Sequence, residues 1–287
     1  MVARFAALLL AAGLLAAALP ARAAGPVPLS TQEKQVIGGR RVQAGEAPWQ
    51  VAFIRRVNLD LVQGVFCGGT LINERWVLTA AHCFRDPDSC DRFDASMFWI
   101  GTGTVDIGST DLELKVAARI VESPQYDCKT FANDLALVEL SKPLANAGRV
   151  RLPSPQDAAT HLAAGSVVMA SGWGLTESEM NSRRLLKVDL KVAPTATCSS
   201  HYGAALPAGS ICAGGGAFDT CRGDSGGPLW VGSGQQAVQL GVVSKGDPCG
   251  KSIAPGIYAP LLAHLKWIED TSKLPACVPV NKDFAVC

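Results

Sequence analysis

The sequence has little net charge and few aromatic residues. Its 287 residues carry a formal net charge of +1, and 6% of them are aromatic. No long run of one charge sign occurs, so we expect no nucleic-acid partner. Apart from one run near the start, no segment is long and apolar enough to span a membrane. No C-x-x-C pair occurs, which argues against a cysteine-bound metal. What remains is a globular composition, sufficient for one large domain or two small ones.

The chain has ten cysteines, which are many for a cytosolic protein and indicate an oxidising compartment. The start of the chain agrees with this. An arginine precedes the apolar run 5–19, and an Ala-Arg-Ala sequence suited to cleavage follows it. We therefore predict a signal peptide over residues 1–23 rather than a membrane anchor. Residues 24–35 are polar and lack periodicity, and we interpret them as a pro-segment.

Short apolar runs separated by Gly, Pro, Asn and Asp follow residue 49 and are typical of strands. Many short strands with turn signals indicate a sandwich or barrels. Leu261, Leu265 and Ile268 then have the spacing of one amphipathic C-terminal helix, with Pro260 in its first turn. The predicted strands are 51–53, 69–72, 76–79, 97–100, 135–140, 167–170, 186–192, 237–244 and 256–258.

The nine residues Thr220–Pro228 read T-C-R-G-D-S-G-G-P. Glycines on both sides of Ser225 allow a sharp turn that exposes its hydroxyl group. The N–H groups of Gly223 and Ser225 can then point together at a developing oxyanion. A Ser-Gly-Gly alone is usually only a loop, but the full string is far more specific.

Two further motifs supply partners for this serine. His82 ends the string W-V-L-T-A-A-H, and a histidine is the natural proton acceptor for a serine hydroxyl. Asp134 lies in N-D-L-A-L, and a buried carboxylate beside an imidazole fixes its tautomer. In this order the three motifs resemble the trypsin/chymotrypsin family. The resemblance implies that Ser225 is the nucleophile, His82 the base and acid, and Asp134 the residue that orients His82.

The resemblance extends from Val36 to about residue 272, which we expect to be the protease domain. It implies an all-β fold of two six-stranded antiparallel β-barrels with a C-terminal α-helix. The active site would lie in the cleft between the barrels, whose boundary we place near residue 153. The tail 273–287, with two cysteines, lies outside the resemblance, and its role is not readable.

The resemblance also implies activation by cleavage. Val36-Ile37-Gly38-Gly39 resembles the mature N-terminus of the family, whose freed α-amino group pairs with the acid before the nucleophile, here Asp224. A buried carboxylate needs such a cation. The bond before Val36 follows Gln35, so we expect an Arg- or Lys-specific enzyme to activate itself poorly.

The primary specificity pocket is the next feature that the resemblance implies. Asp219 stands where the trypsin-like branch has the acid at the bottom of this pocket. Ser244, Gly246 and Gly256 resemble the pocket walls, and the two glycines leave room for a long side chain. A buried carboxylate there selects Arg or Lys.

Four further positions depart from the family pattern. Lys245 stands where the family usually has Trp, and Arg222 replaces a residue that is often neutral. We expect these two cations to favour acidic substrate residues near the cut. Gly101 and Thr102 stand where calcium-binding trypsins place a first acidic ligand, so we expect no calcium site and no other metal.

The resemblance pairs Cys67 with Cys83, Cys198 with Cys212, and Cys221 with Cys249. The remaining four cysteines leave the pairing open. We pair Cys90 with Cys128 and Cys277 with Cys287.

We therefore predict a secreted serine endopeptidase (periplasmic if bacterial) that is made as a zymogen and cuts after Arg or Lys. Its partners would be protein or peptide substrates. We expect no cofactor, no nucleic acid, no membrane contact after signal removal, and a monomer. The main alternative is a catalytically silent relative acting as a binding protein. A second is an esterase of another fold, in which a nucleophile elbow carries the serine.

Overall fold

The structure is a computed structural model of the chain. It describes residues 39–286, apart from 146, 177–179, 217–218, 247–252, 274–277 and 282–283. The chain divides into two compact units, 1–33 and 34–287, and every described residue belongs to the second. The predicted signal peptide and pro-segment, together with Val36, lie outside the described residues.

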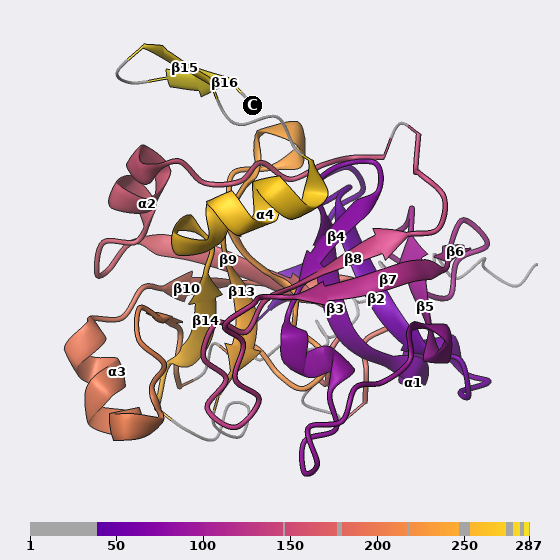
Figure 1. The fold of residues 1–287 in the computed structure, drawn as a ribbon, viewed down its shortest axis with the longest axis horizontal. Helices are drawn as coiled ribbons and strands as arrows, with labels where there is room; N and C mark the ends of the chain where they lie inside the picture. Colours follow the sequence, from indigo (N-terminus) through magenta and orange to yellow (C-terminus); the bar gives the residue numbers. More distant parts are fainter. Residues whose placement is uncertain are drawn as a thin grey trace, which may run out of the picture. The chain divides into compact units, whose positions relative to one another are not determined.

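The first sheet has seven antiparallel strands in the order β6-β5-β2-β3-β4-β8-β7 (Figure 1). They are β2 (Gln50–Arg55), β3 (Val65–Leu71), β4 (Trp76–Thr79), β5 (Phe98–Thr102), β6 (Glu113–Lys115), β7 (Ala117–Glu122) and β8 (Ala136–Leu140). β6 and β7 lie at opposite ends of this order, yet only Val116 separates them in the chain. The sheet must therefore curl until its two edges meet, as in a barrel.

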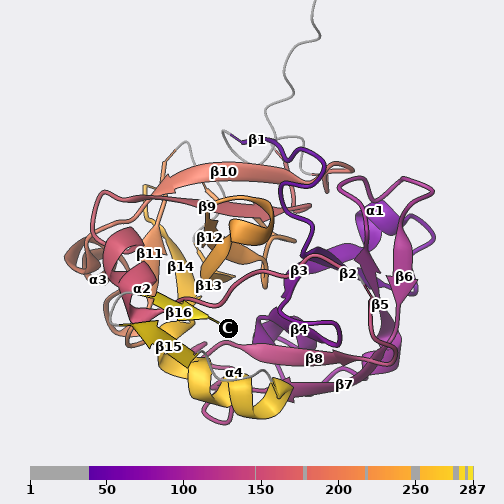
Figure 2. The same cartoon turned by 90° about the horizontal axis from the view of Figure 1, so that it is seen from above.

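The second sheet also has seven antiparallel strands, in the order β1-β10-β9-β12-β13-β14-β11 (Figure 2). They are β1 (Arg40–Arg41), β9 (Val167–Gly172), β10 (Leu186–Lys191), β11 (Ile211–Ala213), β12 (Pro228–Val231), β13 (Val238–Lys245) and β14 (Gly256–Pro260). Just beyond β10, Val192 forms an antiparallel bridge with Ala213 in β11. This bridge closes the sheet on itself and leaves β1 as an added edge strand.

The predicted fold class is confirmed, but the number of strands needs a correction. We predicted six strands in each barrel, and each sheet has seven. In the first sheet, a bend at Val116 divides one edge segment into β6 and β7. In the second, β1 is only the pair Arg40–Arg41, which has no apolar pattern to mark it as a strand.

The predicted C-terminal helix is α4 (Leu265–Ser272). The sequence did not indicate the other helices, α1 (Leu61–Gly64), α2 (Pro155–His161) and α3 (Thr195–Tyr202). α1 and α2 have 4 and 7 residues, which is too short to show a helical apolar period, and α3 has 8 residues but buries only Cys198. Short 3₁₀ helices are η1 (Ala81–Phe84), η2 (Ala95–Met97), η3 (Gly203–Ala205), η4 (Gly234–Gln236) and η5 (Leu262–His264). Across the described parts of the chain, no helix has the length and apolar character to cross a membrane.

The tail contains two further strands, β15 (Val278–Asn281) and β16 (Phe284–Val286), which pair with each other as a hairpin. Its two cysteines, Cys277 and Cys287, lie outside the described residues, so their proposed pairing stays a prediction.

Buried contacts join the two sheets and fix their relative position. The rings of Trp49 and Trp230 meet edge to face with their centroids 5.0 Å apart. The Ser171 hydroxyl donates to the side-chain oxygen of Gln50 at 2.8 Å. The Thr70 hydroxyl donates to the side-chain oxygen of Gln239 at 2.6 Å. All of these polar side chains are buried, so breaking a contact would leave an unsatisfied group inside the protein.

Candidate active site

The structure brings His82 and Asp134 into direct contact. His82 lies in η1, just after β4, and Asp134 lies just before β8, which pairs with β4. The Asp134 carboxylate accepts from the His82 backbone N–H at 2.9 Å and faces Nδ1 of the imidazole at 2.7 Å. Because Nδ1 is hydrogen-bonded to a carboxylate, Nδ1 carries the proton of the neutral imidazole. Nε2 is then free to accept a proton.

Asp134 is fully buried and has a third hydrogen bond, from the Ser244 hydroxyl at 2.6 Å. Burial would raise the pKa of this carboxyl group, but the charge and hydrogen bonds of His82 and the Ser244 hydroxyl outweigh it. The pKa of Asp134 is therefore held below its ordinary value. The sequence assigned Ser244 to the pocket wall, and its contact with Asp134 adds a second role that the motif did not reveal.

Phe131 is a site residue that the sequence analysis missed. Its ring lies 5.3 Å from the imidazole of His82, measured between centroids. Phe131 and Asn133 both have positive φ, 62° and 53°, which is uncommon for residues with a side chain. The segment just before Asp134 is therefore strained, and its neighbours must hold it in place.

Backbone contacts bring Ser225 next to His82. The Ser225 carbonyl accepts from the Gly68 N–H at 2.7 Å and lies 3.8 Å from Sγ of Cys83, the residue after His82. The Cys67–Cys83 disulfide ties β3 to η1 at this point. Within the described residues, no hydrogen bond joins the Ser225 hydroxyl to His82. Such a bond is often long in a site without substrate.

The loop before Ser225 has the form of an oxyanion site. The N–H of Asp224 donates to the Cys221 carbonyl at 3.0 Å, whereas those of Gly223 and Ser225 have no acceptor among the described residues. Gly223 has φ +93°, and a Cβ there would lie 2.8 Å from Cα of Gly174. Only glycine can therefore hold this turn, which leaves two N–H groups available for a negatively charged oxygen.

Ser225 is not on a nucleophile elbow. The string G-D-S-G-G also fits the pattern G-x-S-x-G, but in esterases of that kind the serine lies between a strand and a helix. Here strand β12 begins at Pro228, three residues after Ser225. The esterase alternative therefore does not fit the structure.

Comparison with known proteins agrees with this geometry. The family model described as Trypsin matches residues 36–268. The chain is 33% identical over 254 residues to Cationic trypsin-3 of Rattus norvegicus, across 87% of this chain and 94% of that protein. It is also 33% identical over 244 residues to Trypsin of Sus scrofa, across 83% and 96% of the two chains. The chain belongs to the trypsin family. It is thus a serine endopeptidase with a trypsin-like domain.

In this trypsin-family chain, Asp219 is buried, with 3% of its surface exposed. One oxygen of its carboxylate accepts from the Thr220 N–H at 2.8 Å. A Cβ on Gly256 would lie 3.3 Å from the same oxygen, and one on Gly246 would lie 3.7 Å from Cα of Gly256. The structure thus brings the predicted pocket acid and both wall glycines together. Residues 247–252, which continue the wall, lie outside the described residues.

The second buried acid of this loop, Asp224, is 1% exposed. Its carboxylate accepts from the N–H groups of Cys221 at 2.8 Å and Gly174 at 2.9 Å. Burial raises its pKa to about 6, although these two hydrogen bonds act in the opposite direction. Among the described residues, no cationic side chain lies within ion-pair distance of it.

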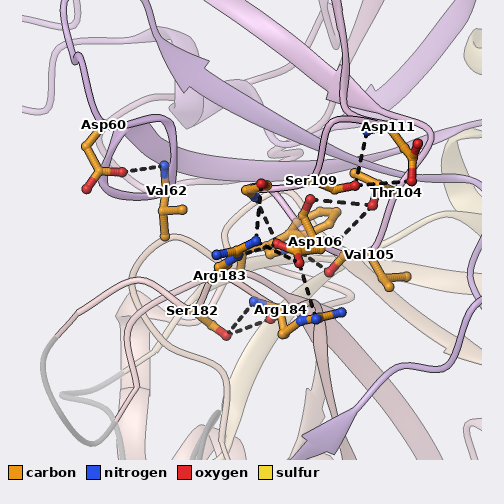
Figure 3. Close-up of polar contacts among 12 residues, drawn as sticks. Asp60, Val62, Thr104, Val105, Asp106, Ser109, Asp111, Ser182, Arg183 and Arg184 are labelled. Carbon is orange, nitrogen blue, oxygen red and sulfur yellow. Dashed lines mark hydrogen bonds and ion pairs between the residues drawn. The ribbon is translucent and has the colours of Figure 1, made fainter.

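The loop after β5 follows Gly101 and Thr102 and contains Asp106, which pairs with two arginines. Figure 3 shows Arg183 and Arg184 against Asp106, whose carboxylate lies 2.7 Å and 3.4 Å from their side-chain nitrogens. These contacts hold the pKa of Asp106 below its ordinary value. In the described residues, only Cys67, His82 and Cys83 cluster as three potential metal ligands, and the disulfide already uses both sulfur atoms.

The structure contains three of the proposed disulfides, Cys67–Cys83, Cys90–Cys128 and Cys198–Cys212. Cys221 is also disulfide-bonded, but its proposed partner, Cys249, lies outside the described residues.

Proposed function

We propose that the chain is a secreted endopeptidase, made as a zymogen, that cleaves peptide bonds after Arg or Lys. The observation that carries the proposal is the contact of His82 with buried Asp134, close to Ser225. The N–H groups of Gly223 and Ser225 have no acceptor in the part of the chain that the structure describes. This arrangement has a nucleophile, a base with an orienting acid, and donors for an oxyanion.

In the proposed mechanism, the Ser225 oxygen attacks the carbonyl carbon while its proton passes to Nε2 of His82. The N–H groups of Gly223 and Ser225 bind the negative oxygen. The C–N bond then breaks, the amine leaves with the proton from His82, and an acyl group remains on Ser225. A water molecule then gives a proton to His82 and attacks the carbonyl carbon of this ester. The bond between the carbonyl carbon and the Ser225 oxygen breaks, His82 returns the proton to Ser225, and the acid product leaves. Asp134 stabilises the imidazolium in both halves.

The preference for Arg or Lys rests on Asp219. Its carboxylate is buried between Thr220 and the glycine walls, and a cationic substrate side chain would pair with it there. A neutral side chain would bury itself beside this charge without forming an ion pair, so we expect it to bind less well.

Activation rests on Asp224. Its carboxylate is buried with two N–H donors and no cationic side chain of the described residues. We propose that cleavage before Val36 frees an α-amino group that inserts beside it. The resulting ion pair would fix the neighbouring turn at Gly223 and so complete the oxyanion site. Because Gln35 precedes the cut, another protease, or an aminopeptidase that trims Gln35, would complete this processing.

The remaining assignments follow from the sequence. We propose a signal peptide over 1–23, a pro-segment over 24–35, a protease domain over 36–272 and a tail over 273–287. Ten cysteines and the disulfides support an oxidising, extracellular or periplasmic location. The substrates would be proteins or peptides, and the enzyme would act as a monomer without nucleic acid.

A fluorophosphonate probe labels only an activated serine. It therefore distinguishes the proposed enzyme from a catalytically silent binding protein. We expect the processed wild type to be labelled and the Ser225→Ala variant not to be. A processed, folded wild type that resists the probe would favour the binding protein.

A further inference from the structure

The ammonium group of Lys245 lies in a small site built from both barrels. Its Nζ donates to the carbonyls of Ala205 at 2.8 Å and Thr130 at 3.2 Å. It also lies 5.4 Å from the centroid of the Phe131 ring. Carbonyl oxygens and an aromatic face are the groups with which proteins hold an organic cation. The cleft therefore contains a cation site that is filled by the chain's own lysine.

This site can also be opened. Among the described residues, neither carbonyl accepts a second hydrogen bond. Thr130 and Ala205 are exposed, and Phe131 is half-buried, so a substrate can reach them if the lysine is removed. Burial lowers the pKa of Lys245, as expected for an ammonium group partly withdrawn from water.

Lys245 lies between the primary pocket and the His82–Asp134 pair. Gly246, which follows it, faces Gly256 at the pocket, and Ser244, which precedes it, bonds Asp134. The Ser225 carbonyl itself is in contact with Gly68 in β3 and with Cys83 in η1. A substrate whose cut residue lies in the pocket therefore passes Lys245, and our proposal places the residues before the cut there.

We propose that Lys245 is a specificity-determining residue that occupies a cation-binding subsite, so that the enzyme rejects Arg and Lys two to four residues before the cut. The inference rests on the proposed endopeptidase function. It also replaces our sequence expectation for Lys245, because an ammonium group already held by two carbonyls has less to offer a substrate carboxylate. The expectation that Arg222 favours acidic substrate residues is unchanged.

The test compares pairs of peptides that share the cut residue. One peptide of each pair carries Arg or Lys two to four residues before the cut, and the other carries neutral norleucine there. We expect Lys245→Ala to raise the kcat/KM ratio of cationic to neutral peptide severalfold, because the substrate cation takes the vacated site. This gain should shrink at high salt. Lys245→Arg keeps the cation in place and should keep the wild-type ratio.

Two further variants sharpen the test. Lys266→Ala removes one positive charge from the exposed surface of α4, where Lys266 pairs with Asp270, and should leave the ratio unchanged. Adding Phe131→Ala to Lys245→Ala should reduce the gain, because the substrate cation loses its aromatic face. The ratio between two peptides cancels any general loss of activity that comes from the contact of Phe131 with His82.

An unchanged ratio in Lys245→Ala, with normal turnover of a simple Arg ester, would overturn this inference and leave the proposed function standing. Failure of the processed wild type to cleave any Arg or Lys substrate would overturn both. If Lys245→Ala does not fold, Lys245→Met keeps most of the side-chain stem and removes the charge. It should raise the ratio by a smaller factor, and no rise there would also overturn the inference.

Discussion

His82 holds Asp134 through two groups at once, the imidazole Nδ1 at 2.7 Å and the backbone N–H at 2.9 Å. The backbone contact fixes the carboxylate to the chain, and the side-chain contact then fixes the ring to the carboxylate. The imidazole is thereby held in one tautomer before any substrate binds, which reduces the reorganisation that the reaction requires.

The first prediction is that Ser225 and His82 act as one unit. Ser225→Ala or His82→Ala alone should lower kcat by roughly four to six orders of magnitude, and the double variant should lose little more. The residual rate would come from the oxyanion site and substrate binding. The measurement is single-turnover cleavage of an Arg anilide by the processed protein. Losses that add in the double variant would contradict the proposed mechanism.

The second prediction concerns the hydroxyl of Ser244. Asp134 has a folded pKa below its unfolded value, so its contribution to stability is present above about pH 4 and is lost as pH falls through the folded pKa. Ser244→Ala removes one of the hydrogen bonds that lower this pKa, so the acid-induced loss of stability should be smaller in the variant, and the variant's deficit should shrink as pH falls below about 4. The bond should be worth about 1.5–3 kcal/mol near pH 7, because its acceptor is charged.

Urea unfolding of Ser244→Ala at a series of pH values checks this. Ser171→Ala is the matched control, since it removes a buried serine hydroxyl that is bonded to neutral Gln50. The control should lose stability equally at every pH. A Ser244→Ala deficit that is just as independent of pH would show that Asp134 is not the group involved.

The sequence predicted most of the strands, because apolar runs between turn residues mark them locally. It missed β1, β6, β7, β11 and β12 of the two sheets. Four of these strands are only two to four residues long, and β7 has a single buried residue and so no apolar alternation. It also missed the contact of Phe131 with His82, because nothing in a single sequence shows that two residues 49 positions apart will stack. The motif residues were found because the chemistry of Ser225, His82 and Asp134 requires those residue types. The site around the Lys245 ammonium group could not be predicted from the sequence. It is formed by backbone carbonyl groups, which every residue has, and only the fold brings these particular ones together.

The third prediction is that Asp219 selects the cut residue. Asp219→Ser should abolish the preference for Arg and Lys, because it removes the buried negative charge with which a cationic substrate side chain pairs. A peptide library varied at the cut residue gives the measurement, with Asp270→Ser on the exposed face of α4 as the charge control. Should the wild type cleave best after Phe or Leu, the assignment of Asp219 to the pocket would be wrong.

The last prediction uses the pKa of Asp224, which burial raises to about 6. In the unfolded chain the value is about 3.9. The folded precursor therefore binds this proton more tightly than the unfolded chain. Its stability should fall as pH rises from about 4 to about 6, by roughly 3 kcal/mol, and then stay level. An α-amino group inserted beside Asp224 would remove the loss, because it pairs with the charged form.

The test compares two proteins that both carry Ser225→Ala to prevent self-cleavage, the unprocessed precursor and a form that begins at Val36. Their difference in unfolding free energy should widen as pH rises from 4 to 7, while shared groups cancel. A form that begins at Ile37 is the matched control, because its amino group is one residue too short to reach. It should behave like the precursor. If the Val36 and Ile37 forms show the same pH dependence, Asp224 does not receive the new terminus. Amino-terminal sequencing of the naturally processed enzyme should then show a start other than Val36.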